Sequence, residues 1–212
     1  KTLQRVVLPE SVTYIRVGAF GNCTDLGEAV LPETLREIEG NAFLYCRALT
    51  TVKLPEGLTR IGDSAFYDCE KLTLESLPST LKSIGEAAFY GCSSLTELTI
   101  PDGVTSIGDA AFWDCIGLES IEIPESVTHL GMEAFGRCMS LTTVKVPDGI
   151  TYINRGLFSG CYALKEIQMP DQITRFESFA FLRCNALETI LLPSKKISHR
   201  KGIRHEKRAR RK

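Results

Sequence analysis

PDGVTSIGDAAFWDCIGLESIEI, residues 101–123, decides the fold, because its pattern returns every 23 residues along the chain. All nine prolines keep this step, from Pro9 to Pro193, and so do eight phenylalanines and all eight cysteines. A step shared by three residue types is typical of one structural unit copied many times. The sequence therefore predicts a single elongated solenoid over residues 1–193, with a partial first repeat and eight complete 23-residue repeats.

The apolar positions of the unit indicate its local structure when they are counted from the proline as zero. The end of the quoted stretch, Leu118 to Ile123, alternates apolar and polar residues and predicts a short strand with one buried face. The next proline cannot donate to a sheet ladder, so it ends the strand. Val104 and Ile107 predict a second, shorter strand. The Ala-Phe-x-x-Cys segment has an apolar spacing of three, which favours one helical or 3₁₀ turn.

The third repeat departs from this pattern. In Leu72–Leu77, Glu75 takes the position that an apolar residue takes in the neighbouring repeats. A lone buried carboxylate is expensive. We therefore expect a local distortion that turns Leu74 inward and Glu75 outward.

Two columns of identical residues are expected to form the core, because stacking of the repeats places equivalent residues directly on one another. Cysteines stacked at strand spacing are close enough for disulfides, but their parallel Cβ vectors do not converge. None occurs as Cys-x-x-Cys, so we favour a reduced, buried cysteine column over a disulfide framework or a metal site. The expected ladder residues are Phe20, Phe43, Phe66, Phe89, Phe112, Phe135, Phe158 and Phe181, with Cys23, Cys46, Cys69, Cys92, Cys115, Cys138, Cys161 and Cys184.

The net charge of −1 conceals an asymmetry. Residues 1–194 carry 15 Lys/Arg against 25 Asp/Glu, whereas residues 195–212 carry ten Lys/Arg against one Glu. The segment 194–212 has no apolar periodicity and is expected to be a disordered basic tail. Nucleic acid, an anionic membrane surface or an acidic polymer would suit it, and so would a role in nuclear localisation or no role at all.

The repeat pattern L-x-x-I-x-I-P-x-x-V-x-x-I-G-x-x-A-F-x-x-C resembles the 23-residue leucine-rich repeats of the BspA-like family. The resemblance covers residues 1–193 and implies a β-rich leucine-rich-repeat solenoid with two short parallel strands in each repeat. It also implies an exported adhesion or ligand-binding module, often one for host extracellular-matrix proteins. The family supplies no catalytic residues to carry over. Extracellular or cell-surface localisation is accordingly expected.

Aromatic side chains mark the first candidate for partner binding. Three occupy the position after the buried phenylalanine in successive repeats, with two further apolar residues nearby: Tyr67, Tyr90 and Trp113, with Ile116 and Met139. Aromatic residues dominate binding hot spots. The alternative is local packing of each ring against its own turn. The outward strand positions hold small, polar residues of mixed charge and specify no class of ligand.

Carboxylates form two further columns. The residue after proline is acidic in seven of eight repeats, and Asp63, Glu86 and Asp109 follow one another in a second column. Such columns would attract Ca²⁺, although solvated turn residues are the simpler interpretation.

Catalysis finds little support in the sequence. His129 is the one histidine within the repeats, at a surface position, and there is no phosphate loop or paired metal motif. We expect a non-enzymatic chain without a cofactor.

The sequence thus favours a binding or adhesion module that presents an extended surface to a protein or glycan partner. A rigid spacer within a larger surface protein and an intracellular interaction scaffold remain the alternatives. No apolar run is long enough to span a membrane. The chain starts inside a repeat, so we expect a monomeric fragment or processed product.

Overall fold

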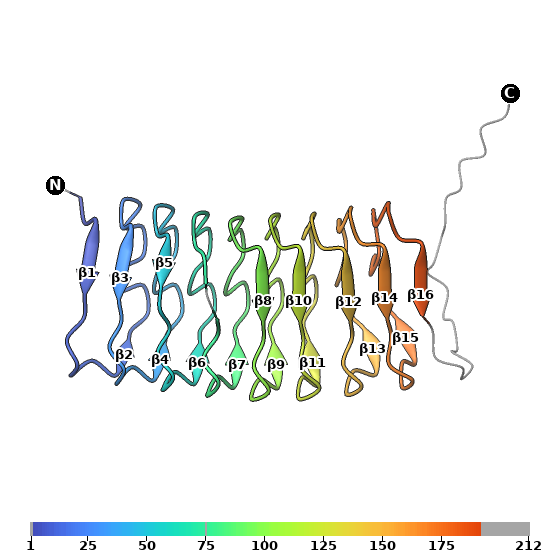
Figure 1. Cartoon of the computed structure of the whole chain (residues 1–212), viewed down its shortest axis with the longest axis horizontal. Helices are drawn as coiled ribbons and strands as arrows, with labels where there is room; N and C mark the ends of the chain where they lie inside the picture. Colours follow the sequence, from blue (N-terminus) through green and yellow to red (C-terminus); the bar gives the residue numbers. More distant parts are fainter. Residues whose placement is uncertain (1, 75, 192–212) are drawn as a thin grey trace, which may run out of the picture.

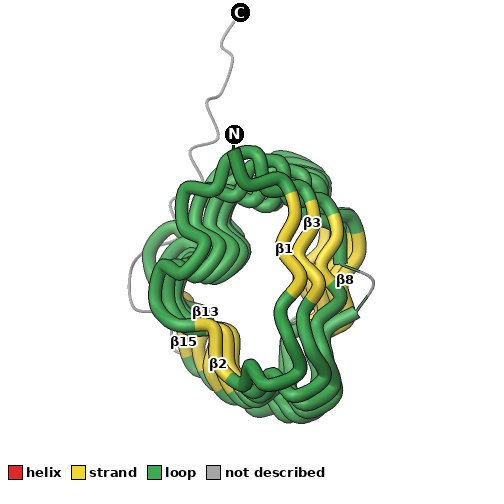
Figure 2. Tube along the Cα trace, turned by 90° about the vertical axis from the view of Figure 1, so that its left-hand side faces the viewer, coloured by secondary structure: helices red, strands yellow, loops and turns green. Residues whose placement is uncertain are grey.

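The computed structural model describes residues 2–74 and 76–191, and within them the chain forms a parallel β-solenoid. Its rungs follow one another along the long axis in sequence order (Figure 1). Rung one begins at Pro9 and rung eight at Pro170, and a residue n places after its proline is given position +n. Figure 2, seen along the axis, shows two rows of strands on opposite sides of the tube, joined by loops and turns.

The first strand row lies at positions +19 to +21 and ends before each proline. The strands that pair in this row are parallel, with partners 23 residues apart, as for Val6 with Ala29 and Leu98 with Ile121. Its strands are β1 (Arg5–Val7), β3 (Glu28–Val30), β5 (Thr51–Val52), β8 (Glu97–Thr99), β10 (Ser120–Glu122), β12 (Thr143–Lys145), β14 (Glu166–Gln168) and β16 (Thr189–Leu191).

The second row lies at positions +5 and +6 and has the same register. Isoleucine or a similar apolar residue points inward at +6, as Ile61 and Ile84 do where β6 pairs with β7. Its strands are β2 (Tyr14–Ile15), β4 (Glu37–Ile38), β6 (Arg60–Ile61), β7 (Ser83–Ile84), β9 (Ser106–Ile107), β11 (His129–Leu130), β13 (Tyr152–Ile153) and β15 (Arg175–Phe176). The predicted solenoid with two short parallel strands per repeat is confirmed.

The Ala-Phe-x-x-Cys segment corrects one detail of the prediction, because it forms consecutive turns instead of a helical or 3₁₀ turn. Within each turn the cysteine N–H bonds to the phenylalanine carbonyl three residues back, as Cys69 does to Phe66 at 3.2 Å. Two residues of every rung, at +9 and +13, have φ between 50° and 78°. A left-handed residue on each side of the phenylalanine interrupts the run of right-handed angles that a helix requires.

The turn segments are nevertheless joined into a third row of contacts. The phenylalanine N–H of one rung bonds to the carbonyl of the residue that precedes the phenylalanine in the next rung, as Phe43 does to Ala65 and Phe66 to Ala88, both at 2.8 Å. Backbone hydrogen bonds therefore tie the turn side of the tube from rung to rung, and they set the spacing of the columns on that side.

The phenylalanine column fills the centre of the tube. The six rings from Phe43 to Phe158 are fully buried, and consecutive rings stack with centroids 5.3–6.0 Å apart. At the two ends, Phe20 and Phe181 are half-buried because each has a neighbour on one side only.

All eight cysteines are free thiols. From Cys46 to Cys184, each Sγ donates to the carbonyl of the phenylalanine in the preceding rung, at 3.0–3.2 Å. Burial raises the pKa of Cys46 to about 12 and raises the pKa of Cys92 and Cys138 well above the usual range. Each interior thiol therefore serves as a neutral hydrogen-bond donor between rungs.

The strand rows are interrupted in places. The second row divides between β11 and β13, and the first divides between β10 and β12 and again at the third rung. Residues 72–74 and 76–77 contribute one isolated bridge, between Thr51 and Thr73, and no strand. Leu74 is half-buried and packs against the core, as expected for a side chain that points inward. Glu75 and the basic tail 194–212 lie outside the described residues. Within residues 2–74 and 76–191, the structure has no helix of the length and apolarity that a membrane crossing requires.

Candidate partner-binding face

The aromatic row lies on the turn side of the solenoid, where each ring follows a buried phenylalanine. Phe66 points into the core, so Tyr67 points outward and is half-buried. The rung-to-rung bonds Asp68 N–H to Tyr90 O (2.7 Å) and Gly91 N–H to Trp113 O (2.8 Å) hold successive members of the row side by side. The structure thus brings the three predicted aromatic residues together on one face.

The rings of this row pack on one another. Tyr67 and Tyr90 stack with centroids 4.4 Å apart and an interplanar angle of 5°. Tyr45 meets Tyr67 edge-on at 5.5 Å and 80°. Trp113 lies over Gly136 of the next rung, where a Cβ atom would collide with its six-membered ring. Sequence reasoning missed Tyr45 because it occupies +13 and the other rings occupy +12.

The two predicted apolar neighbours lie beside the row, at position +15. Ile116 is 41% exposed and Met139 is half-buried. The same column includes Arg47 and the exposed Tyr162. The prediction from the sequence did not include these two residues. We call the set at +12, +13 and +15 of rungs two to seven the turn face; its large side chains are Leu44, Tyr45, Arg47, Tyr67, Asp68, Glu70, Tyr90, Trp113, Asp114, Ile116, Arg137, Met139 and Tyr162.

Charged side chains flank the rings. Arg137 Nε donates to Asp114 Oδ1 at 2.8 Å, whereas Arg47 approaches Glu70 at 3.4 Å and Asp68 at 3.9 Å. Burial, together with nearby carboxylates, raises the pKa of Asp68. Burial beside Tyr90 and Asp68 also raises the pKa of Tyr67 to about 12. The face therefore combines neutral phenols with two arginines that remain about half exposed.

The outward face of the first strand row differs in character. Its charges pair with neighbours along the axis, as Arg5 does with Glu28 at 2.7 Å and Lys53 with Glu33 at 3.5 Å. It holds no tyrosine or tryptophan within the described strands. Pairs this exposed contribute little to stability, and the face shows no feature that selects a ligand.

The acidic columns have a structural use that the sequence did not reveal. Asp63 Oδ1 accepts the N–H of Glu86 at 3.0 Å, and Asp109 Oδ1 accepts that of Met132 at 2.7 Å. In the column after proline, Glu125 accepts the N–H of Asp148 at 2.7 Å. These carboxylates satisfy backbone donors of the next rung, and the described part of the chain contains no cluster of three or more metal-ligating side chains.

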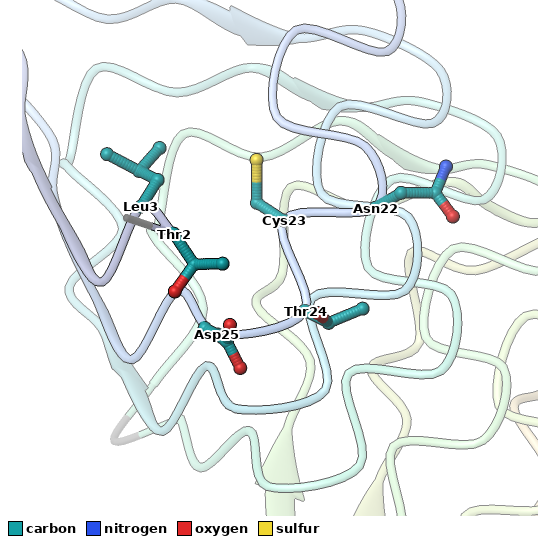
Figure 3. A pocket seen from close by; sticks show the side chains of 6 residues that line it. All are labelled: Thr2, Leu3, Asn22, Cys23, Thr24 and Asp25. Atoms are coloured by element: carbon teal, nitrogen blue, oxygen red, sulfur yellow. The ribbon is translucent and has the colours of Figure 1, made fainter.

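His129 lies exposed on β11, in register with Ser106 of β9. No hydrogen bond joins these two side chains. An opening at the first rung is lined by Thr2, Leu3, Asn22, Thr24, Asp25 and the half-buried Cys23 (Figure 3). This lining contains no basic side chain that could activate the thiol.

The chain belongs to the family of BspA-type leucine-rich repeat proteins. The family's model, which spans six copies of the repeat, matches residues 1–118 and 106–202. Repeats of this family generally serve as non-catalytic binding modules. None of the curated proteins compared with the chain is significantly similar to it.

Several crystal structures of bacterial leucine-rich repeat proteins have the same fold. A protein from Bacteroides ovatus is 28% identical with a TM-score of 0.71, and a leucine-rich cell surface protein from Faecalibacterium prausnitzii is 31% identical with a TM-score of 0.61. A T. pallidum leucine-rich repeat protein is 28% identical with a TM-score of 0.65. These alignments cover 90%, 92% and 89% of this chain, and 55%, 61% and 79% of the respective structures. The chain thus spans little more than half the length of the first two.

Proposed function

We propose that the chain is a non-enzymatic binding module of a bacterial cell-surface protein and that its turn face contacts a protein or glycan partner. The observation that carries the proposal is the distribution of aromatic residues. The chain has six tyrosines and one tryptophan, and five of these seven lie on the turn face: Tyr45, Tyr67, Tyr90, Trp113 and Tyr162. The F. prausnitzii relative, described as a cell surface protein, supports the location.

Side-chain chemistry favours the turn face over the strand rows as the contact surface. Tyrosine, tryptophan and arginine are the residues most enriched among binding hot spots. Isolated rings that only packed on their own turns would not need to lie in consecutive rungs and touch each other, as Tyr45, Tyr67 and Tyr90 do. Ile116 and Met139 extend this surface with apolar area.

Biolayer interferometry with immobilised fibronectin, fibrinogen, laminin, type I collagen and heparin tests the proposal. The matrix proteins follow from the family resemblance. We expect at least one of them to bind, and the variants Tyr67→Ala, Tyr90→Ala and Trp113→Ala to weaken binding about tenfold or more. Thermal melts establish that each variant is folded, and Lys53→Ala on the strand face serves as a control.

Two outcomes would favour other functions. Binding to none of the five ligands would favour a rigid spacer, which the continuous phenylalanine column would suit. Heparin binding that is lost on truncation before Pro193, with no effect of the turn-face variants, would assign the interaction to the basic tail.

A further inference from the structure

We infer that rung six, residues 124–146, is a flexible joint about which rungs seven and eight tilt relative to rungs one to five. The inference goes beyond the proposed function, because it concerns how the solenoid bends and does not depend on any partner. Three features of the structure carry it: both strand rows are divided at this rung, a side chain takes the place of a backbone bond there, and the core rings stack more widely.

The first strand row opens on one side of rung six. Strand β10 of rung five and strand β12 of rung six do not pair. At the end of β12, Val146 N–H bonds to the next rung at 2.9 Å, whereas within the described residues Ile123 N–H, at the end of β10, makes no such bond to rung six. The bond from Thr142 N–H to Glu119 O, 3.2 Å long, remains. Along this row, rung six is therefore held less firmly to rung five than to rung seven.

The second strand row opens on the other side of the same rung. Strand β11 of rung six pairs with β9, and β13 of rung seven pairs with β15, but β11 and β13 do not pair with each other. Thr128 N–H and Thr174 N–H bond to the preceding rung at 3.0 and 2.8 Å. Thr151 N–H lies between them in the column and makes no equivalent bond within the described residues. Rung six thus lacks a ladder toward rung five in one row and toward rung seven in the other.

Asn154 accounts for the opening of the second row. Its Nδ2 donates to Leu130 O at 3.2 Å, and its Oδ1 accepts the N–H of Arg155 at 3.1 Å. At the same position of other rungs the backbone N–H bonds to the preceding rung, at 2.9 Å for Gly131 and 2.8 Å for Glu177. Asparagine side chains compete with the backbone for such carbonyls. The amide group of Asn154 therefore replaces a backbone bond that would close the row.

The core rings also stack more widely from this rung onward. Consecutive ring centroids from Phe20 to Phe112 are 5.3–5.5 Å apart. The distance is 5.6 Å from Phe112 to Phe135 and 5.8 Å from Phe135 to Phe158, and it is 6.0 Å for the next pair. The turn side nevertheless stays closed, because Phe112 N–H and Phe135 N–H reach the next rung at 2.8 and 3.0 Å. Bending at rung six therefore opens the strand rows and keeps the spacing of the turn side.

The third rung does not have the same freedom. The first row is interrupted there, but the second row runs through it without a break from β2 to β11. Among residues 2–74 and 76–191, rung six is the one rung at which both rows are divided. The stability of a repeat array is approximately a sum of terms between neighbouring rungs. Such an array bends and opens where these terms are weakest, which places the joint at rung six.

Native-state hydrogen exchange of the whole chain in rising, sub-denaturing urea tests the inference. The variants Asn154→Gly and Asn154→Glu give this position a residue that leaves the row closed in other rungs, as Gly131 and Glu177 do. Asn41→Gly is the matched control, because it makes the same kind of change at an exposed site of rung two. Circular dichroism melts establish that each variant is folded.

We expect residues 147–191 to exchange as one block, about tenfold or more faster than residues 78–123. Both Asn154 variants should reduce this difference, and Asn41→Gly should leave it unchanged. Exchange that rises gradually from rung to rung toward both ends would be ordinary fraying and would overturn the inference. A boundary at rung three, or a difference that neither Asn154 variant reduces, would overturn it as well. Each of these results would leave the proposed function standing.

Discussion

Replacing one ring in the middle of the phenylalanine column tests how the solenoid is stabilised. Phe112 is fully buried and stacks on Phe89 at 5.4 Å and on Phe135 at 5.6 Å. Phe112→Ala should cost about 3–5 kcal/mol of unfolding free energy, because it leaves a cavity that the hydrogen-bonded rungs cannot close. It also removes two aromatic contacts of about 0.5–1.5 kcal/mol each, which form part of that cost.

Phe20→Ala is the matched control within the same column. Phe20 is half-buried and stacks on one neighbour, Phe43, at 5.3 Å. Its loss should therefore cost about half as much, and it should unravel only the first rung. Urea unfolding followed by far-UV circular dichroism gives the two free energies, and hydrogen exchange locates the loosened rungs. Equal costs for Phe20→Ala and Phe112→Ala would refute the nearest-neighbour account of stability.

Three further predictions follow from the close contacts of the structure. Gly136→Ala should shift the fluorescence of Trp113 and weaken partner binding, because the new Cβ displaces the indole. The control Gly27→Ala should do neither, since its Cβ would meet only Gln4 O and Ala48 O at 3.7 and 3.8 Å. An unchanged Trp113 emission in Gly136→Ala would contradict the packing of Trp113 on Gly136. Of the eight thiols, the half-buried Cys23 should react fastest with a thiol reagent in the folded protein, because burial raises the pKa of the other half-buried thiol, Cys184, to about 11. Rapid labelling of Cys92 would show that the column is open. The contribution of the Cys46 thiol to the unfolding free energy should be fully present below about pH 9 and should be lost as the pH rises toward 12, because burial raises its pKa from 9.0 to about 12 in the folded state and unfolding releases that proton. Stability that increases between about pH 9 and 12 would contradict the buried, neutral thiol column.

The columns of the core could be predicted from the sequence because they depend only on the repeat. Phe and Cys recur every 23 residues, and stacking then places each on its own kind, as the ring distances show. The interruption at the third rung was also predictable in outline, since one carboxylate at an inward position is enough to break a strand.

The turn geometry could not be predicted from the same pattern. Positions +9 and +13 adopt positive φ in every rung, but glycine marks only four of these sites. Ala87 and Ala110 take the left-handed conformation without any residue-type signal, and each donates its N–H to the next rung, to Asp109 and Met132 respectively. The three-residue apolar spacing therefore suggested a helical turn that the backbone does not form.

The candidate face was predicted in part for a related reason. Tyr67, Tyr90 and Trp113 share one column and could be found by alignment of the repeats. Tyr45 and Arg137 join them from the neighbouring column, and their contacts depend on how side chains lean between rungs. The role of Asp63 and Glu125 as acceptors for the next rung likewise depends on the three-dimensional register.

A hydrogen-exchange footprint, measured on the chain alone and in complex with whichever matrix protein it binds, tests the central claim most directly. If the turn face is the contact surface, protection on binding should appear in residues 43–47, 66–70, 89–93, 112–116, 135–139 and 158–162. Strands β8, β10 and β12 should exchange at unchanged rates. Protection confined to those strands, with the turns unaffected, would show that the partner binds the opposite surface and would contradict the account.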